Sequence, residues 1–146
     1  MKRALWLLGL AAGCGGGDPG PTPELSTAGT VEVTARLVEI RGELPRQRLY
    51  DYVYVFKYRV LRVHRGTVEG DEIFVGHYNP LKPRSAARDR FVRDVGGNLD
   101  RFEPGAIHRM ALAAPLEDFY MGGIIDRYFQ EKGTRYWAIC TDRARE

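Results

Sequence analysis

Three histidines are the residues of this 146-residue sequence best suited to acid–base catalysis or metal binding: His64, His77 and His108. A metal site needs several ligands that converge at about 2 Å. The three histidines are far apart in the sequence, and none belongs to an H-x-H or H-x-x-x-H pair. We therefore expect no metal and no cofactor. Because strands can bring distant residues together, a hydrolase built on His77, His108 and a carboxylate such as Asp126 stays open as an alternative.

Residues suited to covalent catalysis lie outside the patterns that this chemistry requires. Ser26 and Ser85 are the only serines, and neither lies in a G-x-S-x-G turn. The adjacent acids Glu117 and Asp118 would face opposite ways on a strand. Cys140 lies in an apolar run without an adjacent histidine or acid, which is typical of a buried, inert thiol. We therefore expect no catalytic residues.

One stretch and the basic segment after it would suit a binding face. In the run Val-Gly-His-Tyr-Asn-Pro at 75–80, the glycine allows a close approach and Asn-Pro favours a turn. The arginines that follow suit acidic groups, because a guanidinium binds them through two parallel hydrogen bonds. The candidate ligand-binding face comprises His77, Tyr78, Asn79, Arg84, Arg88 and Arg90. The alternatives are that Gly76 only relieves crowding and that the basic segment is a solvated loop.

The N-terminus has the layout of a secretory signal peptide. Lys2 and Arg3 precede a nine-residue apolar run, Ala4 to Ala12, which is too short to span a bilayer. The tetrapeptide Ala-Ala-Gly-Cys at 11–14 resembles the lipobox of bacterial lipoproteins, with alanine where leucine is usual. The resemblance implies cleavage before Cys14 and lipidation of its sulfur. Several acyl chains would then form a durable membrane anchor.

This reading divides the chain into a signal peptide (1–13), a lipidated cysteine with a flexible tether (14–29) and one domain (30–146). Gly and Pro are too dense after Cys14 to build a core. Loss of residues 1–13 lowers the net charge from +3 to +1, since 20 basic residues then face 19 acidic ones. Such a small excess argues against nucleic acid as a partner. The expected partners are the membrane, through the lipid, and an envelope protein or polysaccharide outside the cytoplasm.

Period-two patterns of apolar residues predict five strands, at 30–40, 50–65, 72–78, 106–113 and 134–141. In the first strand the apolar face changes parity after Leu37, which predicts a β-bulge. The second strand carries a tyrosine-rich face that we expect to point into the core. Sixteen residues at about 3.3 Å each are too long for a flat strand in a domain of this size. We expect it to bend near Val60 and to serve both halves of a barrel.

The other segments are less regular. Residues 85–94 predict a short helix, and residues 116–130 are ambiguous because two glycines split a weak helical pattern. The strand order resembles the OB-like barrel and, within it, the netrin-type modules of secreted proteins. Their two characteristic strand motifs correspond here to Tyr58–Gly66 and Gly70–Val75.

This resemblance covers about residues 30–80 and implies an all-β fold with minor α. The expected architecture is a small five-stranded OB-like or netrin-like barrel with one or two short helices, and an open β-sandwich is the alternative. The eukaryotic modules are cross-linked by disulfides, which this chain cannot form internally once Cys14 is lipidated. We therefore expect their fold but not their protease-inhibiting activity. The predicted function is a binding or accessory role in the envelope, with a hydrolase or a purely structural protein as alternatives.

Overall fold

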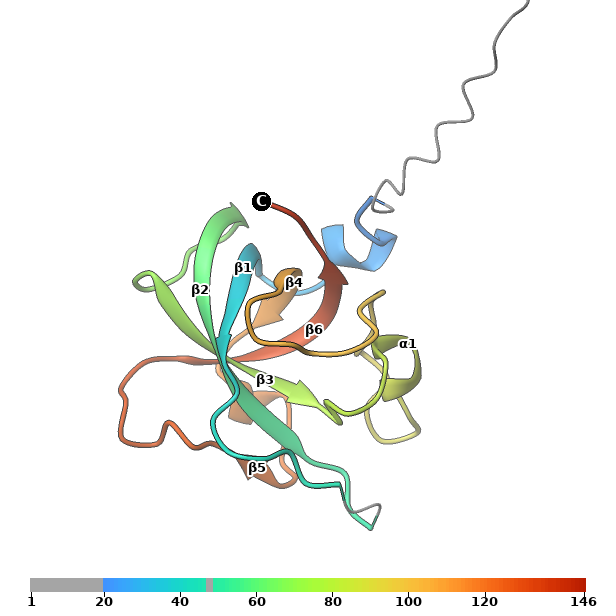
Figure 1. The fold of residues 1–146 in the computed structure, drawn as a ribbon. Coiled ribbons are helices and arrows are strands. Elements are labelled where there is room, and N and C mark those ends of the chain that lie inside the picture. The colour runs from blue at the N-terminus through green and yellow to red at the C-terminus, as the bar shows by residue number, and fades with distance from the viewer. Residues whose placement is uncertain (1–19, 47–48) are drawn as a thin grey trace, which may run out of the picture.

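The computed structural model describes residues 20–46 and 49–146 (Figure 1). The expected signal peptide and Cys14 lie outside these residues. Six strands form the sheet of the described chain: β1 (Val31–Glu39), β2 (Val53–Arg65), β3 (Glu72–Tyr78), β4 (Ile107–Ala113), β5 (Ile124–Ile125) and β6 (Arg135–Arg143). One short helix, α1 (Arg84–Ala87), and two 3-10 helices, η1 (Pro23–Ser26) and η2 (Leu116–Asp118), complete them. The predicted all-β class is confirmed. No helix within 20–46 and 49–146 is long and apolar enough to cross a bilayer.

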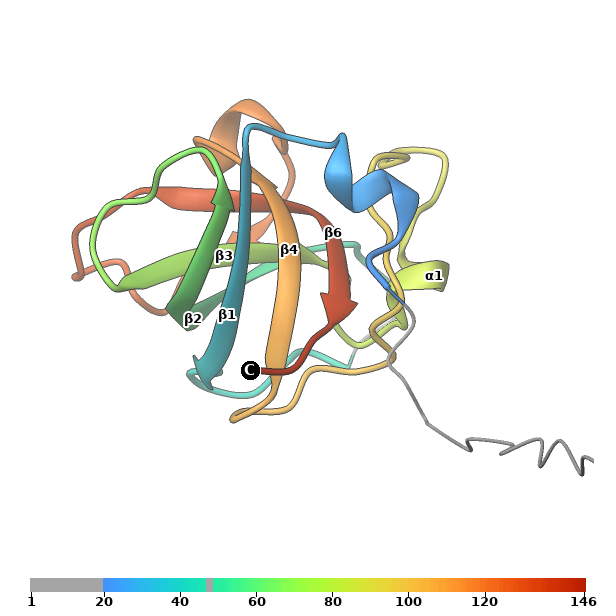
Figure 2. The ribbon, with the colours of Figure 1, turned by 90° about the horizontal axis from the view of Figure 1, so that it is seen from above.

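The sheet closes on itself. β1 pairs with β2 and β4, β2 with β3, and β6 with β4, all antiparallel, while β3 and β6 pair in parallel. Each of the five long strands therefore has two strand neighbours, and they form a ring in the order β1-β2-β3-β6-β4 (Figures 1 and 2). The two-residue β5 adds in parallel to β2. A closed ring of five strands agrees with a small five-stranded barrel and not with an open sandwich.

β2 serves both halves of the ring, as predicted. Its first part, Val53 to Arg59, pairs with β3, and the part from Lys57 to Arg65 pairs with β1. The register with β1 passes over Leu61, so the strand bends where its sequence pattern changes. The same ladder passes over Val38, where the change of parity in β1 predicted a bulge.

The barrel has an inner and an outer apolar layer. Inward-facing side chains of β2 fill the interior together with apolar residues of β1, β3, β4 and β6, and the tyrosine-rich face from Tyr52 to Tyr58 points inward as expected. The alternate residues Val53 and Val55 face outward, where they pack against Trp137, Tyr128 and other residues of the outer layer. The less regular segments between residues 83 and 130 therefore cover one wall of the barrel.

The helix predicted at 85–94 is wrong beyond its first turn, because α1 ends at Ala87. Arg88 has an extended backbone. Asp89 then accepts hydrogen bonds from the backbone N–H groups of Phe91 and Val92, both at 2.9 Å. An aspartate that satisfies nearby amides in this way offers the backbone an alternative to a helix.

The described part of the expected tether packs against the barrel. Leu25 is fully buried on the outside of the sheet, in a cluster with Ala111 and Cys140. The Thr22 N–H donates to a carboxylate oxygen of Asp142 at 2.8 Å. We call residues 20–29 the N-terminal strap. Cys140 is a free thiol and is buried, as predicted. Its burial raises the pKa of the thiol to about 11.

Candidate functional site

Two of the three histidines meet inside the barrel. The Tyr58 hydroxyl oxygen lies 2.9 Å from Nε2 of His77 and 3.0 Å from Nδ1 of His108, and all three side chains are fully buried. The hydroxyl has one proton, so it donates to one ring and accepts from the N–H of the other. The outer nitrogens, His77 Nδ1 and His108 Nε2, have no hydrogen-bond partner among the described residues. The ring that accepts the tyrosine proton carries its own proton on its outer nitrogen. In either arrangement, this outer N–H is a donor without a hydrogen-bond partner among the described residues.

Burial keeps this cluster neutral. It lowers the pKa of His108 to about 4 and that of His77 well below its ordinary value, with the nearby Arg84 charge acting in the same direction. Burial also raises the pKa of the Tyr58 hydroxyl. A general base for reactions at neutral pH needs a pKa close to 7. The cluster does not provide such a group.

Arg84 lies beside the cluster as a buried cation. Its guanidinium donates to the backbone carbonyl oxygens of Tyr78, Asn79 and Lys82 at 2.9, 2.8 and 3.0 Å. It also lies 4.9 Å from the ring centroid of Phe102, which itself packs against His77 at 4.4 Å between ring centroids. Burial lowers the pKa of Arg84 to about 10, so the group stays charged at neutral pH. Arg84 closes the turn after β3 and is not available to an external ligand.

The six residues of the predicted ligand-binding face therefore do not form one open surface. His77, Tyr78, Asn79 and Arg84 are all buried. Arg88 and Arg90 are exposed. The glycine before His77 has a packing reason: a Cβ at Gly76 would lie 2.7 Å from a methyl group of Val53 and 2.8 Å from one of Leu116. The alternative reading, that this glycine relieves crowding, is the one that the packing supports.

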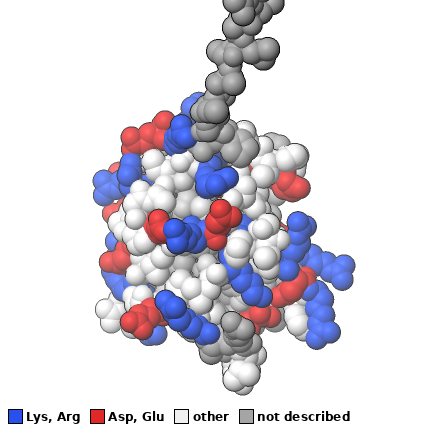
Figure 3. Space-filling view, turned by 45° about the vertical axis from the view of Figure 1, so that its right-hand side comes forward, with Lys and Arg blue, Asp and Glu red and all other residues white. Residues whose placement is uncertain are grey.

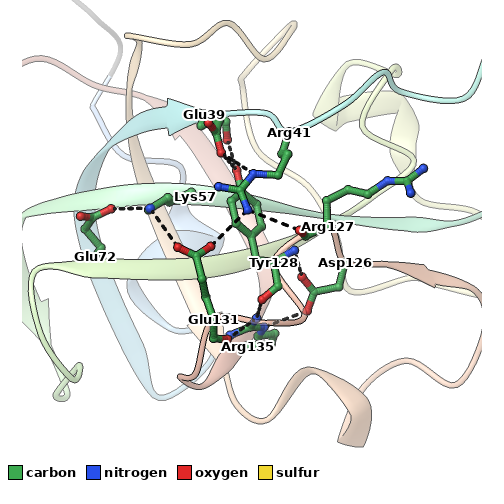
Figure 4. Close-up of polar contacts among 9 residues, drawn as sticks. All are labelled: Glu39, Arg41, Lys57, Glu72, Asp126, Arg127, Tyr128, Glu131 and Arg135. Atoms are coloured by element: carbon green, nitrogen blue, oxygen red, sulfur yellow. Dashed lines mark hydrogen bonds and ion pairs between the residues drawn. The ribbon is translucent and has the colours of Figure 1, made fainter.

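The carboxylate proposed for a hydrolase belongs to a different network. Asp126 accepts hydrogen bonds from Arg135 Nε and from the Tyr128 N–H, both at 2.8 Å (Figure 4). Tyr128 in turn donates to Glu39 at 2.8 Å. The other paired members are Arg41, Lys57, Glu72 and Glu131 (Figure 4). Through Glu39 on β1, Lys57 on β2 and Glu72 on β3, this network holds the segment before β6 against the three strands.

The described residues thus lack two features of a hydrolytic site. Neither His77 nor His108 hydrogen-bonds a carboxylate in residues 20–46 and 49–146. In the same ranges, no three histidine, cysteine or acidic residues are grouped so as to hold a metal ion. The accessible grooves are therefore the better candidates for function.

One groove lies on the outer face of β1 and is rich in arginine. Thr34 forms its floor, and Arg62 on β2 and Arg109 on β4 are the cross-strand partners of Thr34. His64 lies 2.7 Å from the Thr34 hydroxyl through Nε2. We call this cavity of about 620 Å³ the basic groove. Its remaining lining comes from the strap, from Leu61 on β2 and from the C-terminal segment: Gly20, Pro21, Leu61, Asp142, Arg143, Ala144, Arg145 and Glu146.

The charge of the basic groove is local. Over the face drawn in Figure 3, basic and acidic side chains are interspersed and form no broad surface of one sign. Beneath the groove, the buried Glu32 pairs with Arg109 at 2.6 Å and with Arg65 at 3.8 Å. Burial lowers the pKa of His64, and the nearby Arg109 and Arg62 charges act in the same direction. His64 is therefore neutral at pH 7.

A second groove, of about 690 Å³, lies between the loop before β2 and the turn after β3. Tyr50 and Leu81 are its most exposed apolar residues, at 74% and 52% of full exposure. We call it the distal groove, because the loop before β2 lies at the opposite end of the barrel from η1 (Figure 1). Its lining consists of Pro45, Arg46, Tyr50, Asp51, Tyr52, Asn79, Leu81 and Lys82.

The turn under the distal groove is held in a fixed conformation. Asn79 has a left-handed backbone, with a φ of 44°. Its side chain accepts from the Tyr52 N–H at 3.3 Å and donates to Asp51 at 2.9 Å. Arg84 binds the carbonyls of the same turn. Of the predicted face, Asn79 alone lines this groove.

Comparison of the chain with protein-family models, with curated proteins and with solved structures finds no match.

Proposed function

We propose that this protein is a lipid-anchored module of a bacterial envelope that binds another envelope component through the distal groove. The observation that carries the proposal is the placement of this groove. The chain enters the barrel through the strap at one end, and the loop before β2 lies at the other (Figure 1). The exposed Tyr50 belongs to this loop, and the exposed Leu81 lines the same groove from the turn after β3. A barrel held by an N-terminal anchor would turn this groove away from the membrane.

The lining of the distal groove suits a partner with apolar or ring-shaped groups and some acidic ones. The Tyr50 ring offers a flat surface with little conformational entropy to lose, as in other recognition surfaces. Arg46 and Lys82 add positive charge at the rim, where it favours fast association with acidic groups. An envelope protein or polysaccharide would supply such groups.

The anchor can be tested by mass spectrometry of the mature protein isolated from bacterial membranes. We expect an N-terminus at Cys14 with the added mass of a diacylglyceryl group and acyl chains. The Cys14→Ala variant should lose this mass and its tight membrane retention. A wild-type protein without lipid mass would contradict the anchor but not the distal groove.

The groove can be tested by capture from envelope extract and, separately, by co-sedimentation with cell-wall polysaccharide. Truncation of central interface residues commonly costs at least about 2 kcal/mol, so Tyr50→Ser with Leu81→Ser should weaken binding more than about tenfold. The matched control is Phe91→Ser with Phe129→Ser, which removes two comparably exposed aromatic residues elsewhere. Equal binding by both double variants would contradict a role for the groove.

A further inference from the structure

We infer that the basic groove is the membrane-facing surface of the protein and binds the headgroups of anionic phospholipids. The inference rests on the proposed anchoring of Cys14. In this arrangement the folded barrel makes a second contact with the bilayer, in addition to the lipid. The distal groove then lies on the side of the barrel that faces away from the membrane.

The length of chain before the described residues limits how far the groove lies from the anchor. Gly20 and Pro21 are part of the groove lining, and Gly20 is six residues after Cys14. A fully extended chain spans at most about 3.6 Å per residue, so six residues reach about 22 Å. The groove therefore stays within about 22 Å of a lipidated Cys14, however the barrel turns. The contacts of Thr22 and Leu25 with the barrel hold the strap beside this face.

The charges of the groove complement a phosphate headgroup. Four arginines line it, against two carboxylates, and two of the four have acidic partners outside the lining: Arg109 pairs with the buried Glu32 at 2.6 Å, and Arg143 lies 3.9 Å from Asp100. Asp142 already accepts hydrogen bonds from the Thr22 and Asn98 N–H groups at 2.8 and 2.9 Å, and Glu146 pairs with Arg36 outside the groove. A guanidinium donates two parallel hydrogen bonds to a phosphate, which gives both strength and orientation. The four arginines are Arg62, Arg109, Arg143 and Arg145.

An apolar side chain lies next to these cations in the groove lining. Leu61, which directly precedes Arg62, is 40% exposed. It lies in the part of β2 that extends past its pairing with β3, which ends at Arg59. Cations interleaved with exposed apolar groups are the combination that membrane-surface segments present to the headgroup region. Positive charge at this site is attracted by the negative surface potential of anionic lipids.

His64 provides a local signal of occupancy. It bonds to Thr34 on the floor of the groove, and its pKa is lowered by burial and by Arg109 and Arg62, while Glu32 acts in the opposite direction. A phosphate bound among these arginines adds negative charge nearby, which favours the protonated imidazole. Headgroup binding should therefore raise the pKa of His64, whereas His77 and His108 in the barrel interior should not respond.

The test uses residues 15–146, which omit Cys14 but contain the strap, the closed barrel and every described apolar cluster. We expect this fragment to bind vesicles that contain phosphatidylglycerol more tightly than vesicles of phosphatidylcholine alone. Each arginine near an anionic surface contributes about fivefold to binding, so Arg62→Gln with Arg143→Gln should weaken it about 25-fold. The matched control, Arg46→Gln with Arg127→Gln, removes the same charge away from the groove and should change binding less than about twofold.

Three results would overturn the inference. The first is wild-type binding that does not depend on phosphatidylglycerol, and the second is an equal loss in both double variants. The third is a His64 pKa, followed by NMR, that does not rise with anionic vesicles. Thermal melts of each variant show whether the barrel is intact. Because the fragment has no Cys14, these results do not depend on whether the natural chain is lipidated.

Discussion

Lowering the pH from about 7.5 to about 5 is expected to reduce the free energy of unfolding by about 2 kcal/mol through His108 alone. Burial holds the pKa of His108 at about 4 in the folded protein, below its ordinary value of 6.5. The unfolded chain therefore binds a proton as the pH falls through 6.5, while the folded chain stays neutral until about 4. The stability is fully present above 6.5 and is lost as the pH falls towards 4. His77 and His64 also have lowered pKa values and add losses of the same sign.

Urea unfolding at several pH values measures this effect. Between pH 6.5 and pH 5 one such buried histidine contributes an average slope of about 1 kcal/mol per pH unit, so His108→Gln should reduce the slope by about that amount. Glu39 and Asp89 have lowered pKa values as well, but carboxylates of this kind act below this window. A wild-type protein with no pH dependence in the window would show that its buried histidines are accessible to protons when folded.

The barrel was predictable because its strands have one buried face. Side chains alternate along a strand, so a one-residue shift would turn the whole apolar set to solvent. The alternation from Tyr52 to Tyr58 therefore indicated the inner face, and the parity changes near Leu37 and Val60 indicated two of the three irregular points of the β1–β2 ladder. The outer layer was less predictable, because both local and distant contacts shape its segments. The side chain of Asp89 binds nearby backbone N–H groups just after α1, and the pairing of β5 with β2 depends on residues far apart in the sequence.

The site was less predictable than the fold. His77 and His108 lie on β3 and β4, which are not neighbours in the sheet, so their shared contact with Tyr58 arises only when the ring closes. The alternate polar residues Glu32, Thr34 and Arg36 of β1 could have indicated a polar outer face. The sequence could not have indicated the walls of the basic groove. These walls are formed by the strap and the C-terminal segment, which lie over the outer face of β1.

Trp137→Ala is expected to cause the largest loss of stability of any single substitution considered, about 4 kcal/mol, which is typical of a fully buried tryptophan. The indole lies on the outer wall of the barrel, in the cluster with Val53 and Val55. It stacks on Tyr120 with a centroid distance of 5.8 Å and an angle of 6° between the rings. Its N–H donates to Asp94 at 3.3 Å.

Trp137 therefore contacts two parts of the outer layer, one on each side of β4 in the sequence. Chemical denaturation should show the loss, and Phe129→Ala, which truncates a ring that is 76% exposed, should change stability by less than about 0.5 kcal/mol. Hydrogen exchange should become faster at residues 89–95 and 116–125 before it does in the inner barrel strands, because these segments lose their shared contact. Uniform protection across the chain of the variant would contradict this and would mean that the outer layer and the barrel unfold as one unit.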